Sequence, residues 1–209
     1  MFRLSALCPL LLILVLATPA LADRPLPPPQ QEGGMGLFEA LKKRSSAPGG
    51  DFSAGEITPQ ELSTLLWAAT GLNRGTTGWT VPMAHGRPPY CRVYLADANG
   101  VFLYDWSAHA LKEISPRNIK ADIGAQSFVK KAAAVLIIVS DAQALAEFGA
   151  SAAEFSQVAA GAMTQNVYLT AAALGIGARY VRSLRQDAVV KALNLPEGDV
   201  PICLMLLGK

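Results

Sequence analysis

The run Lys42-Lys43-Arg44-Ser45-Ser46 is the densest group of side chains in the sequence that could bind a ligand. Lys43 and Arg44 could hold a phosphate through charge-assisted hydrogen bonds, and the Ser45 hydroxyl could bond to a polyol. The same run follows a short apolar pattern typical of a helix, and cations at a helix C-terminus stabilise the helix dipole without any ligand. The residues alone therefore leave two interpretations open, an anion site or a helix end.

The other candidates for chemistry are two histidines and two cysteines. His85 and His109 are the only histidines, and with Cys91 and Cys203 they show no spacing typical of zinc ligands, so no metal site is expected. Cys91 and His85 could form a hydrolytic pair, because such pairs are made in space rather than in sequence. Cys91 and Cys203 could also form a disulfide after export, or remain two buried thiols.

The motif Gly175-Ile176-Gly177 is expected to end a helix. A dinucleotide-binding fingerprint has three glycines, follows a strand and opens a helix. Here there are two glycines, and they follow an Ala-rich helical pattern, so the interpretation as a helix C-cap is favoured.

The elements that must position these residues mix helices with strands. Helical patterns cover 36–44, 59–70, 142–149, 152–174 and 186–194, with mixed helical character over 116–131. The sequence predicts a hairpin of 91–95 and 101–105, and strands over 133–140, 179–183 and 200–207. Residues 71–90 are rich in Gly, Pro, Thr and Asn and are expected to form a long loop. This order, which combines hairpin pairing with helices, predicts an α+β fold.

The N-terminal part of the chain differs from the rest. Residues 1–22 combine Arg3, an apolar run and a small-x-small ending at Ala22, which predicts a cleavable secretory signal. Residues 23–35 are expected to form a Pro-rich extended tether, and 36–209 a single domain. We therefore expect an exported protein, periplasmic or secreted.

The composition excludes several classes of protein. A chain that is 51% hydrophobic and 16% charged is not disordered. A formal net charge of +2 gives no support to nucleic-acid binding. After the signal, no apolar run approaches the ~20 residues that would span a bilayer.

A series of segments resembles the nitroreductase family, in particular its small SagB-type branch. The segments are ALKKRSS, ITPQELSTLLWAATGLNR, VYLADANGVFLYDWSAHAL, QNVYLTAAALGIGA and PICLMLLGK, in order over residues 36–209. The resemblance implies a central mixed or antiparallel sheet flanked by helices, in an intertwined homodimer with FMN at the dimer interface. It also implies a ping-pong cycle in which NAD(P)H reduces the flavin and a small-molecule acceptor, such as a quinone or nitroaromatic, then takes the electrons.

The resemblance also assigns roles to individual residues. Lys43 and Arg44 would face the FMN phosphate, and Ser45 would face the ribityl chain. The backbone of Val181-Arg182-Ser183 would approach the flavin edge that carries N5 and O4. No catalytic side chain is implied, because the isoalloxazine ring carries the chemistry.

Two departures from the family pattern leave an alternative open. Ala47 stands where the family usually has Arg or Lys near flavin N1 and O2, and Met83 stands where relatives have Ser in a loop that also carries ring-contacting amides. His85 or Arg87 could substitute for those amides. The sequence thus favours an exported FMN-dependent NAD(P)H oxidoreductase, with a flavin-free scaffold acting as a ligand-binding or interaction module as the alternative.

Overall fold

A computed structural model describes residues 23–49, 52 and 55–209 of the chain. The predicted secretory signal over 1–22 lies outside the described residues. No helix in the described ranges is long and apolar enough to cross a membrane.

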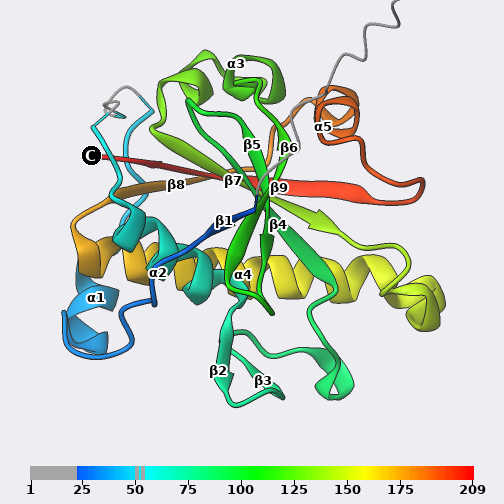
Figure 1. The fold of residues 1–209 in the computed structure, drawn as a ribbon, viewed down its shortest axis with the longest axis horizontal. Coiled ribbons are helices and arrows are strands. Elements are labelled where there is room, and N and C mark those ends of the chain that lie inside the picture. The colour runs from blue at the N-terminus through cyan, green and yellow to red at the C-terminus, as the bar shows by residue number, and fades with distance from the viewer. Residues whose placement is uncertain (1–22, 50–51, 53–54) are drawn as a thin grey trace, which may run out of the picture.

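A seven-stranded sheet forms the centre of the molecule, in the order β1-β6-β5-β4-β7-β9-β8 (Figure 1). Its strands are β1 (Arg24–Pro25), β4 (Cys91–Ala96), β5 (Val101–Asp105), β6 (Ala110–Ser115), β7 (Ala134–Ser140), β8 (Gly177–Val181) and β9 (Val200–Gly208). Each pairing in the described sheet is antiparallel. The α+β class is therefore confirmed, and the sheet is antiparallel rather than mixed.

Helices cover both faces of this sheet. One face packs against α2 (Pro59–Thr70) and α4 (Ala152–Leu174), and α1 (Leu37–Lys43) lies against α4. The other face packs against α3 (Lys120–Ile123), the 3-10 turn η2 (Ser127–Lys131) and α5 (Gln186–Leu193). All residues of β7 are buried, as expected for a strand between two apolar layers.

Local signals in the sequence explain the two longest helices. Thr58 and Glu61 form a capping box at the start of α2, with Pro59 at the first helical position. At the end of α4, Gly175 adopts a left-handed conformation with φ of 70°, and the N–H of Ile176 bonds to the Ala171 carbonyl at 2.8 Å. The interpretation of the glycine motif as a helix C-cap is therefore confirmed.

Three segments of the structure differ from what the sequence predicts. The helix predicted over 142–149 is wrong, because this stretch forms turns and the 3-10 helix η3 (Ala146–Ser151), interrupted by Gly149 at φ of 54°. Strand β6 was not predicted, since Lys112 and Glu113 make its sequence polar. The expected loop over 71–90 contains a two-stranded ribbon, β2 (Leu72–Arg74) with β3 (Gly78–Trp79), and the short 3-10 turn η1 (Ala84–Gly86).

The Pro-rich N-terminal segment is extended, as expected, but it packs against the domain. β1 pairs with β6, and the Pro27 carbonyl accepts hydrogen bonds from Ser63 Oγ and from His109 Nε2 at 3.1 Å. The other ring nitrogen of His109 bonds to the Tyr104 hydroxyl at 2.9 Å. Because a carbonyl only accepts, the neutral ring carries its proton on Nε2. His109 thus holds the N-terminal segment on the sheet.

Candidate cofactor-binding site

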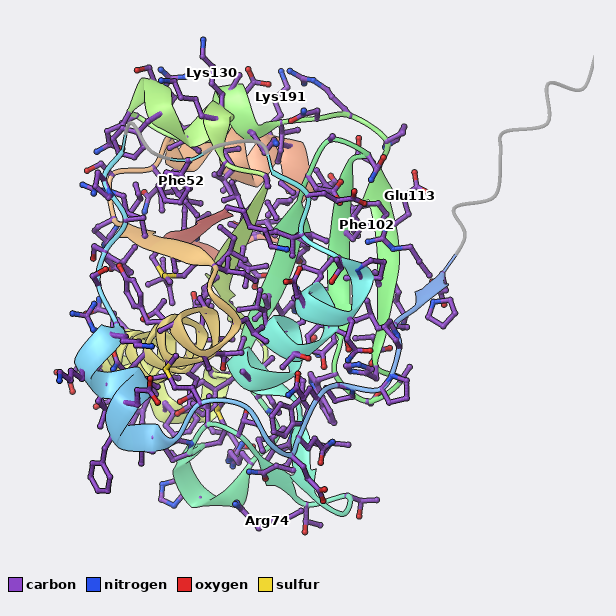
Figure 2. The ribbon with its side chains drawn as sticks, turned by 90° about the vertical axis from the view of Figure 1, so that its left-hand side faces the viewer. Phe52, Arg74, Phe102, Glu113, Lys130 and Lys191 are labelled. Atoms are coloured by element: carbon purple, nitrogen blue, oxygen red, sulfur yellow. The ribbon has the colours of Figure 1, made fainter. Side chains whose placement is uncertain are left out.

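The free edge of β8 brings together the residues that the sequence singled out. β8 is an edge strand, and the chain after α1 runs beside it (Figures 1 and 2). The N–H of Ala47 donates to the Ala178 carbonyl at 2.9 Å. Figure 2 shows Phe52 on the far side of β8 from α4, within the apolar layer that packs on the other face of the sheet.

Tyr168 on α4 connects this segment to the strand. Its hydroxyl accepts from the N–H of Tyr180 at 2.7 Å and shares a hydrogen bond of 2.8 Å with Ser46 Oγ. Sequence reasoning chose Ser45, but the structure anchors Ser46 and leaves Ser45 exposed. Ser45 and Ser46 are both exposed, and a ligand can reach the Ser45 hydroxyl from solvent.

Lys43 and Arg44, the two cations assigned to the phosphate, lie at the end of α1. Lys43 pairs with Glu39 at 2.8 Å, and both side chains are more than half exposed. Such an i,i+4 surface pair contributes only about 0.3–0.5 kcal/mol, so an anion can compete for Lys43. The guanidinium of Arg44 lies over the Tyr168 ring, 5.2 Å from its centroid. The interpretation of this run as a helix end is confirmed. The side chains of Lys43 and Arg44 remain accessible at that end.

Arg182 and Ser183 follow directly after β8 instead of lying in the predicted strand 179–183. Successive residues of an antiparallel edge strand point their backbone groups alternately to the neighbouring strand and to the open edge. Ala178 and Tyr180 use the open edge, as their bonds to Ala47 and Tyr168 show. Continued one residue past the end of β8, the same alternation would direct the N–H of Arg182 to this edge. The Ser183 carbonyl is held by the N–H of Ala125 at 3.1 Å.

Gln126 is a residue of this region that sequence reasoning missed. Its Oε1 atom is buried and has no hydrogen-bond partner among the described residues. Gly124 pairs with Leu184, and Ala125 bonds to Ser183, so the two segments run antiparallel. The same register places Gln126 beside Arg182. A buried acceptor without a donor costs stability, which points to a donor supplied by a ligand or water. No sequence pattern marks this position.

A cation lies beside Ala47, although position 47 itself carries none. Arg179 Nη1 donates to the Ala47 carbonyl at 2.8 Å, and its guanidinium lies 5.2 Å from the Phe128 ring centroid. The sequence placed Arg179 in a strand and gave it no role. Its contact with Ala47 depends on the tertiary packing of the two segments.

The cysteines and His85 take no part in this edge. Cys91 and Cys203 are free and buried, so the disulfide is not formed, and burial raises the pKa of each thiol to about 12. The Cys91 thiol contacts the Ser156 carbonyl, whereas the His85 ring lies beside Phe148. The structure therefore does not make the hydrolytic pair. Arg87 pairs with Glu147 and is engaged there.

A cavity of about 320 Å³ lies beyond Arg182, between α4, η3 and the start of β9. Its walls include Ala and Gly residues of these elements together with Leu145, Pro201 and Ile202. Arg182 lines the same cavity as residues of α4.

Comparisons with known proteins agree with this fold and this edge. The Nitroreductase family model matches residues 41–209. A relative from Methanocaldococcus jannaschii, named as a nitroreductase, is 27% identical over 183 residues, covering 83% of this chain and 90% of the relative. The chain belongs to the nitroreductase family, and it is a nitroreductase-family oxidoreductase.

Solved structures extend the comparison. A Ralstonia eutropha JMP134 protein described as a nitroreductase superposes with a TM-score of 0.84 and 32% identity, covering 90% of this chain and 89% of that one. The Escherichia coli microcin synthetase McbBCD complex gives 0.69 and 17% identity, with 99% and 84% covered. The NADPH:FMN oxidoreductase of Vibrio harveyi complexed with NAD⁺ gives 0.57 and 22% identity, with 82% and 67% covered. The last two likenesses concern the fold alone.

The donor set at the β8 edge fits FMN. Two accessible cations and an exposed hydroxyl suit a phosphate and a ribityl chain. The open backbone edge at Arg182 and the unpaired buried oxygen of Gln126 suit the acceptor and donor atoms of a flavin ring. Residues 81–90 carry no amide side chain, whereas Gln126 on another segment offers one.

Proposed function

We propose that the protein is an FMN-dependent NAD(P)H oxidoreductase that passes electrons to a quinone, a nitroaromatic or a similar small acceptor. The observation that carries the proposal is the β8 edge. Arg44 and Tyr168 lie beside this strand, and Arg182 follows directly after it. The fold neighbour from Vibrio harveyi is named an NADPH:FMN oxidoreductase and binds NAD⁺, which supports the same cofactors here. The net reaction with a quinone converts NAD(P)H, a proton and quinone into NAD(P)⁺ and hydroquinone.

The residues of this chain bind and orient the cofactor. When bound, FMN supplies a hydride acceptor at N5 and returns two electrons to the second substrate. Lys43 and Arg44 bind the phosphate, and Ser45 bonds to the ribityl chain. The N–H of Arg182 donates to the ring edge, and Gln126 Oε1 accepts from the one ring N–H. Arg179 adds positive charge beside Ala47, where the reduced ring would need it.

A homodimer is part of the proposal. Large apolar side chains are exposed on α1 and α4, notably Phe38 at 86% and Val158 at 73%. α1 packs against the C-terminal part of α4 (Figure 1), whereas Val158 lies nearer the N-terminal end of that helix. Exposed apolar area of this kind is typical of a surface that a partner covers. The β8 edge lies against the same two helices.

Export is also proposed, from the signal pattern over residues 1–22. The N-terminal sequence of protein recovered from the periplasm or medium tests it. A start near Asp23 is expected, and intact Met1 in the membrane fraction would contradict it. The packed strand β1 begins only one residue after that cleavage point.

The alternative, a flavin-free scaffold, is favoured by one observation: Ala47 has no charge of its own. The two functions predict different effects of Arg44 on FMN binding. If FMN binds, Arg44→Ala removes a charge-assisted hydrogen bond worth ~1.5–3 kcal/mol and weakens binding by roughly ten- to a hundredfold.

Fluorescence titration of FMN into the purified variants measures this loss. Lys42→Ala is the matched control, since Lys42 is an exposed neighbour outside the proposed contacts. It should bind FMN as the wild type does. If the Arg44 and Lys42 variants bind FMN with equal affinity, Arg44 does not bind the FMN phosphate.

A further inference from the structure

The cavity beyond Arg182 is chemically unlike the rest of the β8 edge. Ala146 and Gly149 of η3, Ala152 and Ala153 of α4, and Ile202 of β9 contribute to its walls. These groups offer methyl and CH surface. A volume of about 320 Å³ is at the lower end of the ~300–1,000 Å³ typical of small-molecule sites.

The hydroxyls on the cavity wall are already satisfied. Ser140 Oγ donates to the Val200 carbonyl and accepts from the Val200 N–H, both at 3.2 Å. Ser156 Oγ donates to the Ala153 carbonyl at 2.9 Å. The hydroxyls of Ser140 and Ser156 thus already have backbone partners, and Gln157 is the other uncharged polar side chain on the described cavity wall.

Arg182 is the one charged residue among the described residues that line the cavity. None of the ion pairs between described residues includes Arg182. By contrast, Arg92 is shared between Asp141 and Asp199 within hydrogen-bond distance. The Arg182 guanidinium thus keeps its full hydrogen-bonding capacity for a ligand, and its planar fork matches a carboxylate.

We infer that this cavity binds an aromatic carboxylate, and that the second substrate of the proposed oxidoreductase is a member of this class that also carries a quinone or nitro group to accept the two electrons. The apolar walls receive the rings, and the Arg182 side chain binds the carboxylate. Arg182 then binds two ligands. Its backbone N–H binds the cofactor, and its guanidinium binds the substrate. The role as second substrate rests on the proposed function, whereas the binding preference stands without it.

Calorimetric titration with two non-redox probes tests the binding preference. The probes are 2-naphthoate and its neutral counterpart 2-naphthamide, added to the purified full chain without flavin. A charge-assisted hydrogen bond predicts roughly ten- to a hundredfold tighter binding of the carboxylate. Equal affinity for the two probes would overturn the inference.

Three variants locate the site. Arg182→Gln should abolish the preference for the carboxylate and leave naphthamide binding nearly unchanged. Arg185→Gln, an exposed arginine outside the cavity, is the matched control and should keep the preference. Ala146→Phe should fill the cavity and remove binding of both probes, with circular dichroism and thermal unfolding confirming that it is folded. Retained preference in Arg182→Gln would contradict the assignment.

Addition of FMN separates the two proposals. With FMN bound, naphthoate should still bind and should compete with the acceptor menadione during NADH oxidation. Displacement of naphthoate by saturating FMN would overturn the inference, because the cavity would then belong to the cofactor. If FMN does not bind at all, the proposed function fails, and the probe affinities alone decide whether the cavity selects aromatic carboxylates.

Discussion

Single residues carry the proposed site in two different ways. Lys43 and Arg44 stand out in the sequence, because their charge and their place at the end of a helical pattern are visible there, whereas Arg182 is assigned only by the resemblance to the family. Tyr168 and Gln126 do not, because their roles arise from contacts between segments far apart in the chain, such as the bond from Tyr180 to Tyr168. A buried amide oxygen without a hydrogen-bond partner cannot be recognised from the sequence.

The unpaired oxygen of Gln126 leads to a prediction on cofactor affinity. Gln126→Ala removes an acceptor for the ring N–H and should weaken FMN binding by roughly two- to tenfold, as one neutral hydrogen bond is worth ~0.5–1.5 kcal/mol. Titration with FMN methylated at N3 is the matched control, because that flavin has no N–H to donate. Wild type should prefer FMN, and the variant should bind both flavins alike. An unchanged preference in the variant would exclude this contact.

The elements show which parts of the fold the sequence determines locally. Helices α2 and α4 have the predicted bounds, because a capping box begins one and Gly175 ends the other. β6 escaped prediction since it is held by its neighbours β5 and β1 despite its polar residues. The Pro-rich segment also gains its structure from tertiary contacts, because only the folded sheet and α2 offer it partners.

The contact of His109 with the N-terminal segment predicts a dependence of stability on pH. Burial lowers the pKa of His109, although the hydrogen bond to the Pro27 carbonyl raises it in smaller part. The unfolded chain therefore takes up a proton near pH ~6.5 while the folded chain still excludes it, and stability falls as the pH drops below that value. His109→Asn should reduce this fall, and asparagine tolerates the φ of 47° at this position.

Urea unfolding at about pH 7.5 and about pH 5 measures the effect on the two sides of the histidine transition. His85→Asn is the control, because His85 is exposed and also has a positive φ, of 57°. It should show the same pH dependence as the wild type. If the His109 and His85 variants lose stability on acidification to the same extent as the wild type, the contribution of His109 is excluded.

At the scale of the whole molecule, an apolar surface remains uncovered in the single chain. Phe38 and Leu41 on α1 are exposed at 86% and 47%. The account predicts that the wild type sediments as a dimer at ~10 µM and that Phe38→Glu shifts it to monomer, since a charge in an apolar interface is costly. Lys130→Glu, at a labelled position away from α1 in Figure 2, should remain dimeric. A monomeric wild type would contradict the proposed assembly.

The central claim is that the β8 edge binds a flavin that NAD(P)H reduces. Anaerobic addition of NADH to the protein saturated with FMN tests it most directly, with the visible absorbance of oxidised flavin as the readout. The account predicts binding at or below ~100 µM FMN, loss of the oxidised absorbance on addition of NADH or NADPH, and its return when menadione is added. Absence of FMN binding at that concentration, or bound FMN that neither nucleotide reduces, would contradict the claim.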